Sequence, residues 1–447
     1  MEIQALKQVL QENGIVGAGG AGFPTYAKLD ERAEIIIMNC AECEPLLKLH
    51  RQLLEQKAEE ILWAFAQIAE TVGAKEAVIG IKEEYKATLE ALYRYIDAYP
   101  NMRIQLLAGA YPMGDEVVLI YEATGRVIRP GGLPIEEGVA VFNVETVYNV
   151  YRALAENAPV ADKLVTVVGE VEHPVTVRVP LGTTIAKTVA YAGKILVKNP
   201  AFLAGGPMMG NLCLSEDVVT KTTNAIIVLD QTHTLIQKKQ HNTAIDLKRA
   251  ASACCQCQTC TDLCPRHALG HPIEPHKFMR SAANQDFQEL NVFLDTMFCS
   301  SCGLCEMYSC PQSLSPRTLI AEYKAGLRKA GVKAPEGVKP APVAESREYR
   351  KVPEARLAAR LGLSQYDGEA PLVEDAYAEE HSPVKKVRIL LSQHIGAPAV
   401  PVVSVGDVVH KKDVIAKPGK GLSVAIHASI DGVVQRVEKD FVVIAAG

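Results

Sequence analysis

Nine of the twelve cysteines lie between Cys254 and Cys310, and their spacing suits metal binding. They form two runs, C-x2-C-x2-C-x3-C-P from Cys254 and C-x2-C-x2-C-x4-C-P from Cys299. Disulfides are rare in a reducing cytosol, and such clustering indicates thiolate ligands rather than scattered core packing. A two-residue spacer lets a tight loop aim successive thiolates at one centre. These residues therefore offer the chemistry of iron–sulfur electron transfer.

The fourth cysteine of each run precedes a proline that ends the loop, so its thiolate reaches elsewhere. The first run has the spacing of bacterial ferredoxins, and the second has one extra residue before its last cysteine. In two-cluster ferredoxins that last cysteine ligates the other cluster. We therefore predict two [4Fe–4S] clusters with crossed ligands. One is expected on Cys254, Cys257, Cys260 and Cys310, and the other on Cys299, Cys302, Cys305 and Cys264.

A pair of zinc sites is the alternative for these thiolates. Zinc sites usually combine two C-x2-C knuckles, whereas here three closely spaced cysteines are followed by C-P. Cys255, next to a predicted ligand, is expected to be spare, and Cys213 to be a small core residue. The pair Cys40-x2-Cys43 could be redox-active, but a role in shaping a loop is favoured.

A glycine-rich loop, GAGGAGFPT, begins at Gly17 and formally contains G-x-G-x-x-G. The dinucleotide-binding version of that motif must follow a strand and open a helix, whereas here a helix precedes the loop, so the ordinary Rossmann interpretation fails. Glycines at this density still let backbone N–H groups approach a phosphate, and Thr25 and Lys28 add a donor and a positive charge. A flexible turn is the alternative.

The loop resembles the FMN-binding loop of the NADH-binding flavoprotein subunit of respiratory complex I and of RnfC-type electron-transport subunits. Three further motifs follow in the order of that family: NCAECEP at 39–45, YPMGDE at 111–116 and FNVET at 142–146. The resemblance implies an FMN-binding domain with NADH as electron donor.

The resemblance also assigns individual residues. It places FMN against Gly17, Gly19, Gly20, Gly22 and Lys28, with hydrogen bonds from Asn39 and Asn143. It places Glu42, Glu44 and Glu116 near the nucleotide. For each glutamate the alternative is an ordinary helix-end or surface charge.

The surrounding elements predict an α/β fold with several domains. Buried strands at 34–39, 77–82 and 104–109 alternate with a long helix at 50–72 and a helix from about Asp115. Together with the resemblance, these elements imply a Rossmann-like FMN/NADH domain (1–160), an SLBB-type β-grasp domain (161–235), a helical two-cluster ferredoxin-like domain (245–330), a proline- and charge-rich linker (331–383) and a barrel-sandwich hybrid (384–447).

The last domain resembles lipoyl and biotinyl carriers but lacks their attachment motif. Lys420-Gly421 is the nearest match, and attachment there is not favoured, so we expect a structural or docking module with His427 packed inside. RnfC-type subunits carry such a domain at the N-terminus. The order here resembles the cobalamin reductases of propanediol utilisation, and that resemblance covers essentially the whole chain.

Composition excludes several other functions. The net charge of −5 argues against a nucleic-acid surface. No apolar run reaches the ~18 to 20 residues of a membrane span, and the N-terminus lacks the order of a secretory signal. We therefore expect a soluble, cytoplasmic protein, and the resemblance to the propanediol-utilisation reductases implies a location in a bacterial microcompartment.

Together these features predict electron transfer from NADH through FMN and two [4Fe–4S] clusters to cobalamin. The resemblance implies a cobalamin adenosyltransferase as partner, and microcompartment shell proteins are further candidates. Two alternatives remain, an RnfC-like subunit of a membrane complex and an electron conduit through a microcompartment shell without its own substrate. A zinc-stapled scaffold is a third, and it predicts a colourless protein.

Overall fold

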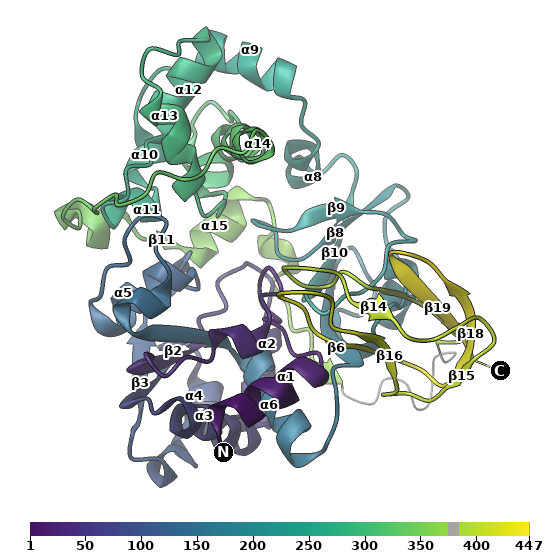
Figure 1. Ribbon diagram of the computed structural model, residues 1–447. Coiled ribbons are helices and arrows are strands. Elements are labelled where there is room, and N and C mark those ends of the chain that lie inside the picture. The colour runs from purple at the N-terminus through teal and green to yellow at the C-terminus, as the bar shows by residue number, and fades with distance from the viewer. Residues whose placement is uncertain (374–383, 447) are drawn as a thin grey trace.

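The hydrophobic runs found in the sequence form most of a parallel sheet in the N-terminal domain of the computed structural model, which describes residues 1–373 and 384–446 (Figure 1). The strand order is β3-β2-β1-β5. The strands are β1 Ile35–Cys40, β2 Glu76–Lys82, β3 Met102–Leu107 and β5 Val139–Asn143. Because all pairings are parallel, the carboxyl ends of these strands share one edge.

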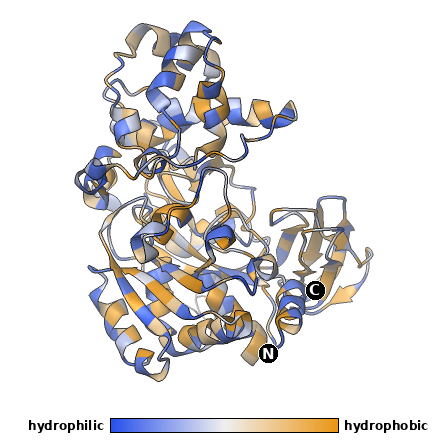
Figure 2. Ribbon diagram, turned by 60° about the vertical axis from the view of Figure 1, so that its left-hand side comes forward, coloured by the Kyte–Doolittle hydropathy of each residue, from blue (hydrophilic) through white to orange (hydrophobic). Residues whose placement is uncertain are grey.

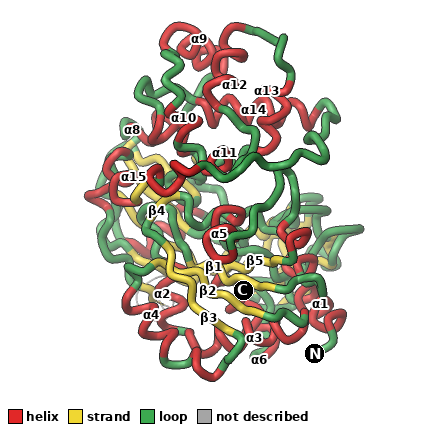
Figure 3. Tube along the Cα trace, turned by 90° about the vertical axis from the view of Figure 1, so that its left-hand side faces the viewer, coloured by secondary structure: helices red, strands yellow, loops and turns green. Residues whose placement is uncertain are grey.

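Helices cover both faces of this sheet, as expected for an α/β domain (Figure 3). Along β1, Ile36 and Met38 face one core and Ile37 faces the other. The first core is shared with α1 Ile3–Glu12, α2 Leu49–Gln56, α3 Ala58–Val72, α4 Lys86–Tyr93 and α6 Val144–Ala155. The second is closed by α5 Glu116–Thr124.

The single helix expected over 50–72 is in fact two helices. Lys57, with φ −127° and ψ 35°, ends α2 and precedes α3. Leu53 of α2 and Ile61 of α3 pack into the same core on either side of this break. His50, in the first turn of α2, lies at the carboxyl edge of the sheet beside Asn143.

A six-stranded sheet of order β12-β7-β6-β10-β8-β9 follows. Its main strands are β6 Asp162–Gly169, β7 Val175–Pro180, β8 Pro200–Ala204, β9 Asn211–Cys213 and β10 Ala225–Asp230, with α7 Ile185–Val189 between β7 and β8. The antiparallel pair β6–β7 and the parallel pair β6–β10 give the β-grasp arrangement expected from the sequence.

The cysteine-rich part is a helical unit at the top of Figure 1. It contains α8 Thr234–Lys239, α9 Thr243–Ala253, α10 Thr259–Asp262, α11 Pro265–Ala268, α12 Pro275–Asn284, α13 Asn291–Leu294 and α14 Pro316–Lys329. Its helices carry both apolar and polar residues (Figure 2), and their apolar faces enclose a small core around Phe278, Phe293 and Leu319. The cysteine loops are therefore held between short helices.

The segment 331–383, expected as a linker, is folded along the molecule wherever it is described. Its strand β11 Val352–Pro353 pairs with β4 Ala110–Tyr111 of the N-terminal domain, and helix α15 Glu354–Arg360 follows. Its strand β12 Leu372–Val373 extends the β-grasp sheet beside β7. The buried Lys82 at the end of β2 forms an ion pair with Glu354. Paired backbone and this ion pair make the segment part of the fold.

The C-terminal strands form two small sheets, β13-β19-β18-β15 and β14-β16-β17. They are β13 Lys386–Leu390, β14 Val400–Pro401, β15 Val408–Val409, β16 Val414–Lys417, β17 Ile426–His427, β18 Gly432–Val437 and β19 Phe441–Ala445. Lys420 is exposed, and His427 is buried, as the sequence predicts.

This domain docks on the glycine-rich loop, since the backbone N–H of Ile395 donates to Gly22 O at 3.1 Å. Within the described residues, no helix is both long and apolar enough to cross a bilayer.

Lys221 joins three domains from a fully buried position. Its Nζ donates to Gly14 O at 2.6 Å and to Ala425 O at 3.1 Å, and burial lowers its pKa from 10.5 to about 7. Between pH 7 and pH 10.5, Lys221 is therefore protonated in the unfolded chain but not in the folded chain. The contribution of Lys221 to stability therefore rises as pH increases from about 7 to 10.

We expect Lys221→Met to remove this rise. The melting temperatures of the parent and the variant should be measured from pH 6.5 to 10. The melting temperature of the parent minus that of the variant should increase as the pH rises. A constant difference across that range would contradict the buried lysine's lowered pKa.

Candidate flavin and iron–sulfur sites

The glycine-rich loop lies at the carboxyl edge of the parallel sheet, beside Asn143. Ala18 N donates to the hydroxyl of Thr146, which anchors the loop to the start of α6. A Cβ atom added to Gly19 would lie 2.4 Å from Asn143 Nδ2, whereas one added to Gly20 would meet nothing within 4 Å. Both glycines are exposed. The loop thus presents backbone to solvent at the edge where ligands bind in open α/β sheets.

The two predicted asparagines order this edge. Asn39, at the end of β1, donates from Nδ2 to Gly114 O at 2.9 Å and accepts from Ala41 N at 3.1 Å. The Asn143 side-chain oxygen caps α6 by accepting from Glu145 N at 3.0 Å. Its amide nitrogen is therefore free to donate to His50 Nε2, 3.3 Å away.

His50 is a site residue that the sequence did not reveal. Burial lowers its pKa to about 4, so the ring is neutral at pH 7. Because Nε2 accepts from Asn143, the ring proton sits on Nδ1, which faces Glu42 Oε1 at 3.5 Å. Glu42 also accepts from His50 N at 3.2 Å, and burial raises the pKa of its carboxyl.

Behind His50 lies a buried ion pair between Glu145 and Lys163. Glu145 belongs to the FNVET motif, so that motif marked its position in the sequence. Lys163 belongs to the β-grasp domain, and nothing in the sequence connected it to this site.

Three other predicted residues have partners within the protein. Lys28 Nζ donates to Glu116 Oε1 at 3.0 Å and to Val141 O at 2.9 Å, so the structure brings two of the predicted ligands together. Glu44 accepts from Met208 N at 2.8 Å and Met209 N at 2.9 Å, both in the β-grasp domain. The nucleotide role of Glu44 and Glu116 stays a prediction, and Glu44 also holds two domains together.

Cys40 and Cys43 do not converge. Cys40 is buried in the core beneath α2 and α3, whereas Cys43 accepts from Gly114 N at 3.3 Å on the other side of the loop. Burial raises the pKa of both thiols, to about 12 for Cys43. The arrangement supports a role in shaping the loop.

The eight predicted cluster ligands line two cavities, grouped as the crossed pattern predicts. We call Cys264, Cys299, Cys302 and Cys305 the inner set, which lines a cavity of about 350 Å³. We call Cys254, Cys257, Cys260 and Cys310 the outer set, which lines a cavity of about 360 Å³. Cys255 also lies at the rim of the outer cavity and is exposed.

The loop backbone around the middle cysteine is the same in both sets. Gln256 and Gln258 flank Cys257 with φ values of 54° and 63°, and Ser301 and Gly303 flank Cys302 with 60° and 81°. Left-handed residues on both sides curl each loop around its cavity. Backbone N–H groups donate to sulfur, from Ser301 to Cys299 and from Leu314 to Cys310. Hydrogen bonds of this kind tune iron–sulfur clusters, so the residues fit the predicted group.

The extra residue of the second run forms a π-helical turn over Cys305–Ser309. A one-residue insertion widens a helical turn in this way. The widened turn carries Cys310 away from the inner set and into the outer cavity. In the part of the chain that the structure describes, no three cysteine, histidine or carboxylate side chains converge on a single-ion site.

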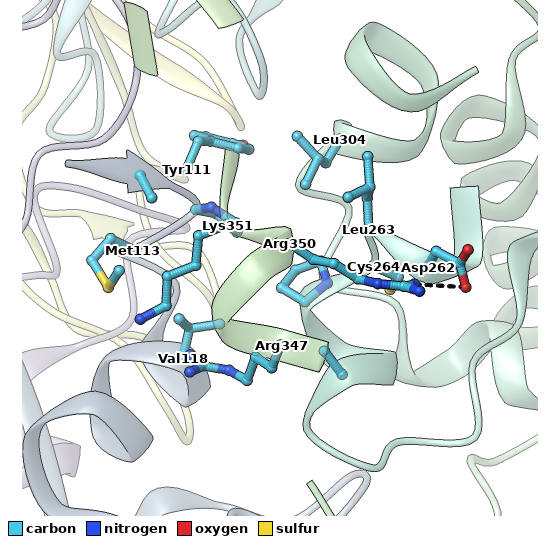
Figure 4. Close-up of a pocket in the computed structure, with 14 residues that line it drawn as sticks. Tyr111, Met113, Val118, Asp262, Leu263, Cys264, Leu304, Arg347, Arg350 and Lys351 are labelled. Carbon is cyan, nitrogen blue, oxygen red and sulfur yellow. Dashed lines mark ion pairs between the residues drawn. The ribbon is translucent and has the colours of Figure 1, made fainter. Parts of the chain in front are cut away.

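The inner set lies against the N-terminal domain. The Tyr111 hydroxyl donates to Cys302 O at 2.5 Å, and Arg266, two residues after Cys264, pairs with Asp115 at 2.9 Å. Figure 4 shows Tyr111 and Met113 on one side of this junction and Cys264 on the other, with Arg347 and Arg350 of the folded-back segment between them. In the outer set, by contrast, Cys257 is exposed.

Four family models match the chain in sequence order. They are the Nuo51 FMN-binding domain over 10–152, the SLBB domain over 164–212, a 4Fe-4S dicluster domain over 253–315 and the RnfC barrel sandwich hybrid domain over 369–447. These matches confirm the expected fold class, and they confirm FMN and [4Fe–4S] clusters as the cofactors that these domain families bind.

Cobalamin reductase PduS of Salmonella typhimurium is 40% identical over 99% of this chain and 96% of its own length. The chain belongs to the PduS cobalamin reductase family. PduS of Citrobacter freundii is 38% identical over 100% of this chain and 97% of its own length. One component of the Na⁺-translocating ferredoxin:NAD⁺ oxidoreductase complex of Acetobacterium woodii is 29% identical, over 60% of this chain and 59% of its own length.

For this PduS-family protein we expect Gly19→Ala to disturb the flavin loop, because the added methyl would collide with Asn143. Overpacking of this kind costs about 1–3 kcal/mol. Thermal melting of the flavin-free protein should show the loss. Gly20→Ala, with open space at its Cβ, is the matched control and should melt like the parent. Equal melting of the two variants would contradict this packing.

Cys257→Ser should halve the iron content, from about eight to about four atoms per chain, by removing the outer cluster. Cys255→Ser should keep all the iron, because Cys255 lies outside the predicted ligand sets. Iron and sulfide analysis of anaerobically purified protein measures both. If Cys255→Ser instead lost half the iron, Cys255 would be the ligand and the assignment would be wrong.

Proposed function

We propose that this protein oxidises NADH and passes electrons one at a time, through FMN and two [4Fe–4S] clusters, to cobalamin. The observation that carries the proposal is the near full-length identity to cobalamin reductases, 40% and 38%. A flavin accepts a hydride and releases single electrons, which is the conversion that NADH and iron–sulfur clusters require.

The residues at the carboxyl edge of the sheet support this role. The exposed backbone of Gly19 and Gly20 would receive the flavin phosphate, together with Gly17, Gly22 and Lys28. Asn39 and Asn143 would hydrogen-bond to the flavin. Glu42, Glu44 and Glu116 are the acids proposed for the nucleotide side, where Glu116 is already paired with Lys28.

The position of the two cysteine sets suggests the order in which their clusters act. Tyr111 connects the N-terminal domain directly to Cys302, so the inner cluster would receive electrons first. Burial raises the pKa of Tyr111, which keeps its hydroxyl a donor to the Cys302 carbonyl. The outer cluster, beside the exposed Cys257, would pass electrons to the acceptor.

Reduced cobalamin is the form that an adenosyltransferase uses, so we propose that enzyme as partner. Shell proteins of a bacterial microcompartment are proposed as further partners, with the microcompartment as the location. An electron conduit through the shell is the second candidate, and an RnfC-like role is weaker because the Acetobacterium woodii protein matches only 60% of this chain.

Anaerobic purification followed by addition of NADH and hydroxocobalamin tests the proposal. The protein should contain FMN and about eight irons, and the corrin spectrum should pass from the cob(III) to the cob(II) and cob(I) forms. A protein that oxidises NADH but leaves the corrin spectrum unchanged would favour the conduit. A colourless protein with zinc would contradict both.

A further inference from the structure

A cavity of about 290 Å³, lined mostly by polar and charged residues, lies beside the outer cysteine set, between α8, the first turns of α9 and the loop before α14. In Figure 1, α8 and the chain that leads from it to α9 lie on the right of the helical unit. The cavity shares Leu314 with the outer cluster cavity, and Leu314 N donates to Cys310 Sγ at 3.4 Å. An occupant would therefore be separated from the outer cluster by a single loop. The volume is at the lower end of the range of small-molecule sites, which suits part of a large ligand rather than the whole of it.

Asp246 gives the cavity an unsatisfied acceptor. Its side chain is buried, with 7% of the residue exposed, and lines the cavity. One carboxylate oxygen accepts from Ser315 Oγ at 3.2 Å, whereas Oδ2 is buried with no hydrogen-bond partner among the described residues. A buried charged oxygen without a donor is costly, so a ligand that donates a hydrogen bond would be bound favourably.

The charges around the cavity favour a neutral ligand. Asp246 and Glu306 are opposed by Lys238 and Arg249, so neither an anion nor a cation is preferred. Both carboxylate oxygens of Glu306 already accept from Thr318. The carboxylate that still lacks a hydrogen bond is therefore Asp246, and the ligand must donate a hydrogen bond to its Oδ2 atom.

Arg249 lies three residues after Asp246, on the same side of α9. It uses one N–H to reach Ser313 O at 3.3 Å, and its guanidinium has five N–H donors in all. Asp246 can accept an N–H while Arg249 donates to a carbonyl oxygen. A primary carboxamide carries both groups.

We propose that this cavity binds the peripheral primary carboxamides of a corrin, through Asp246 and Arg249, and so holds the electron acceptor beside the outer cluster. The inference rests on the proposed function, because that function supplies the corrin. The cavity would accommodate one edge of the corrin macrocycle with its carboxamide side chains. The proposed binding is non-covalent and includes no electron transfer.

Equilibrium dialysis of the oxidised holoprotein, without NADH, tests the site. Two probes separate amide recognition from other contacts: cobinamide keeps the peripheral carboxamides, and cobyrinic acid carries carboxylates in their place. The parent should bind cobinamide at least about tenfold more tightly than cobyrinic acid. Asp246→Asn, which puts a donor where an acceptor is needed, should weaken cobinamide binding about tenfold.

Arg249→Met should also weaken cobinamide binding. This variant provides an independent test if the Asp246→Asn protein loses its iron–sulfur clusters. Glu289→Gln, which removes one negative charge from an exposed position of the same domain, is the matched control and should bind like the parent. Iron content and bleaching of the clusters by NADH should be unchanged in all three variants.

Cobinamide binding that is equally tight in the parent, Asp246→Asn and Arg249→Met would overturn the site, as would equal binding of the two probes. These results are separate from the proposed function. If the parent binds cobinamide through Asp246 but NADH never reduces the corrin, the site stands and the reductase function fails. If NADH reduces the corrin equally well in every variant at limiting corrin, the function stands and the site fails.

Discussion

The junction between the N-terminal domain and the inner cysteine set is the contact on which the proposed electron transfer depends. Electron transfer needs its carriers close together, and two connections fix this junction, Tyr111 to the Cys302 carbonyl and Asp115 to Arg266. Both N-terminal residues belong to the YPMGDE segment. The same short segment therefore shapes the flavin edge through Gly114 and positions the iron–sulfur unit.

Several buried polar contacts connect the other domains to the N-terminal domain. Glu44 accepts two backbone N–H groups from the β-grasp domain, and Lys82 pairs with Glu354 of the folded-back segment. Lys221 ties the N-terminal and C-terminal domains together. Because a buried charge is costly without a partner, each contact favours one relative position of its domains. The C-terminal domain contacts the glycine-rich loop through the hydrogen bond from Ile395 N to Gly22 O.

The repeated backbone of the two cysteine loops explains why two unequal spacings can serve equivalent sites. Left-handed residues flank the middle cysteine in both loops, and the π-helical turn absorbs the additional residue of the second loop. The outer set is left near the surface and next to the polar cavity lined by Asp246, while the inner set faces the flavin domain. The proposed direction of electron flow follows from this asymmetry.

Local patterns in the sequence were sufficient to specify the cofactor chemistry and the order of the domains. Cysteine spacing and glycine loops can be recognised locally, because a cluster or a phosphate imposes its own geometry on a few neighbouring residues. The three-dimensional fold was needed to show that helix 50–72 is broken at Lys57 and that the described part of 331–383 folds back as strands and helix. It also showed that His50 and Lys163 both lie beside Glu145. It was also needed to show that Glu44 binds backbone of another domain. These contacts join residues far apart in the chain, and their partners leave no periodic or spaced signal in either segment, so packing had to reveal them.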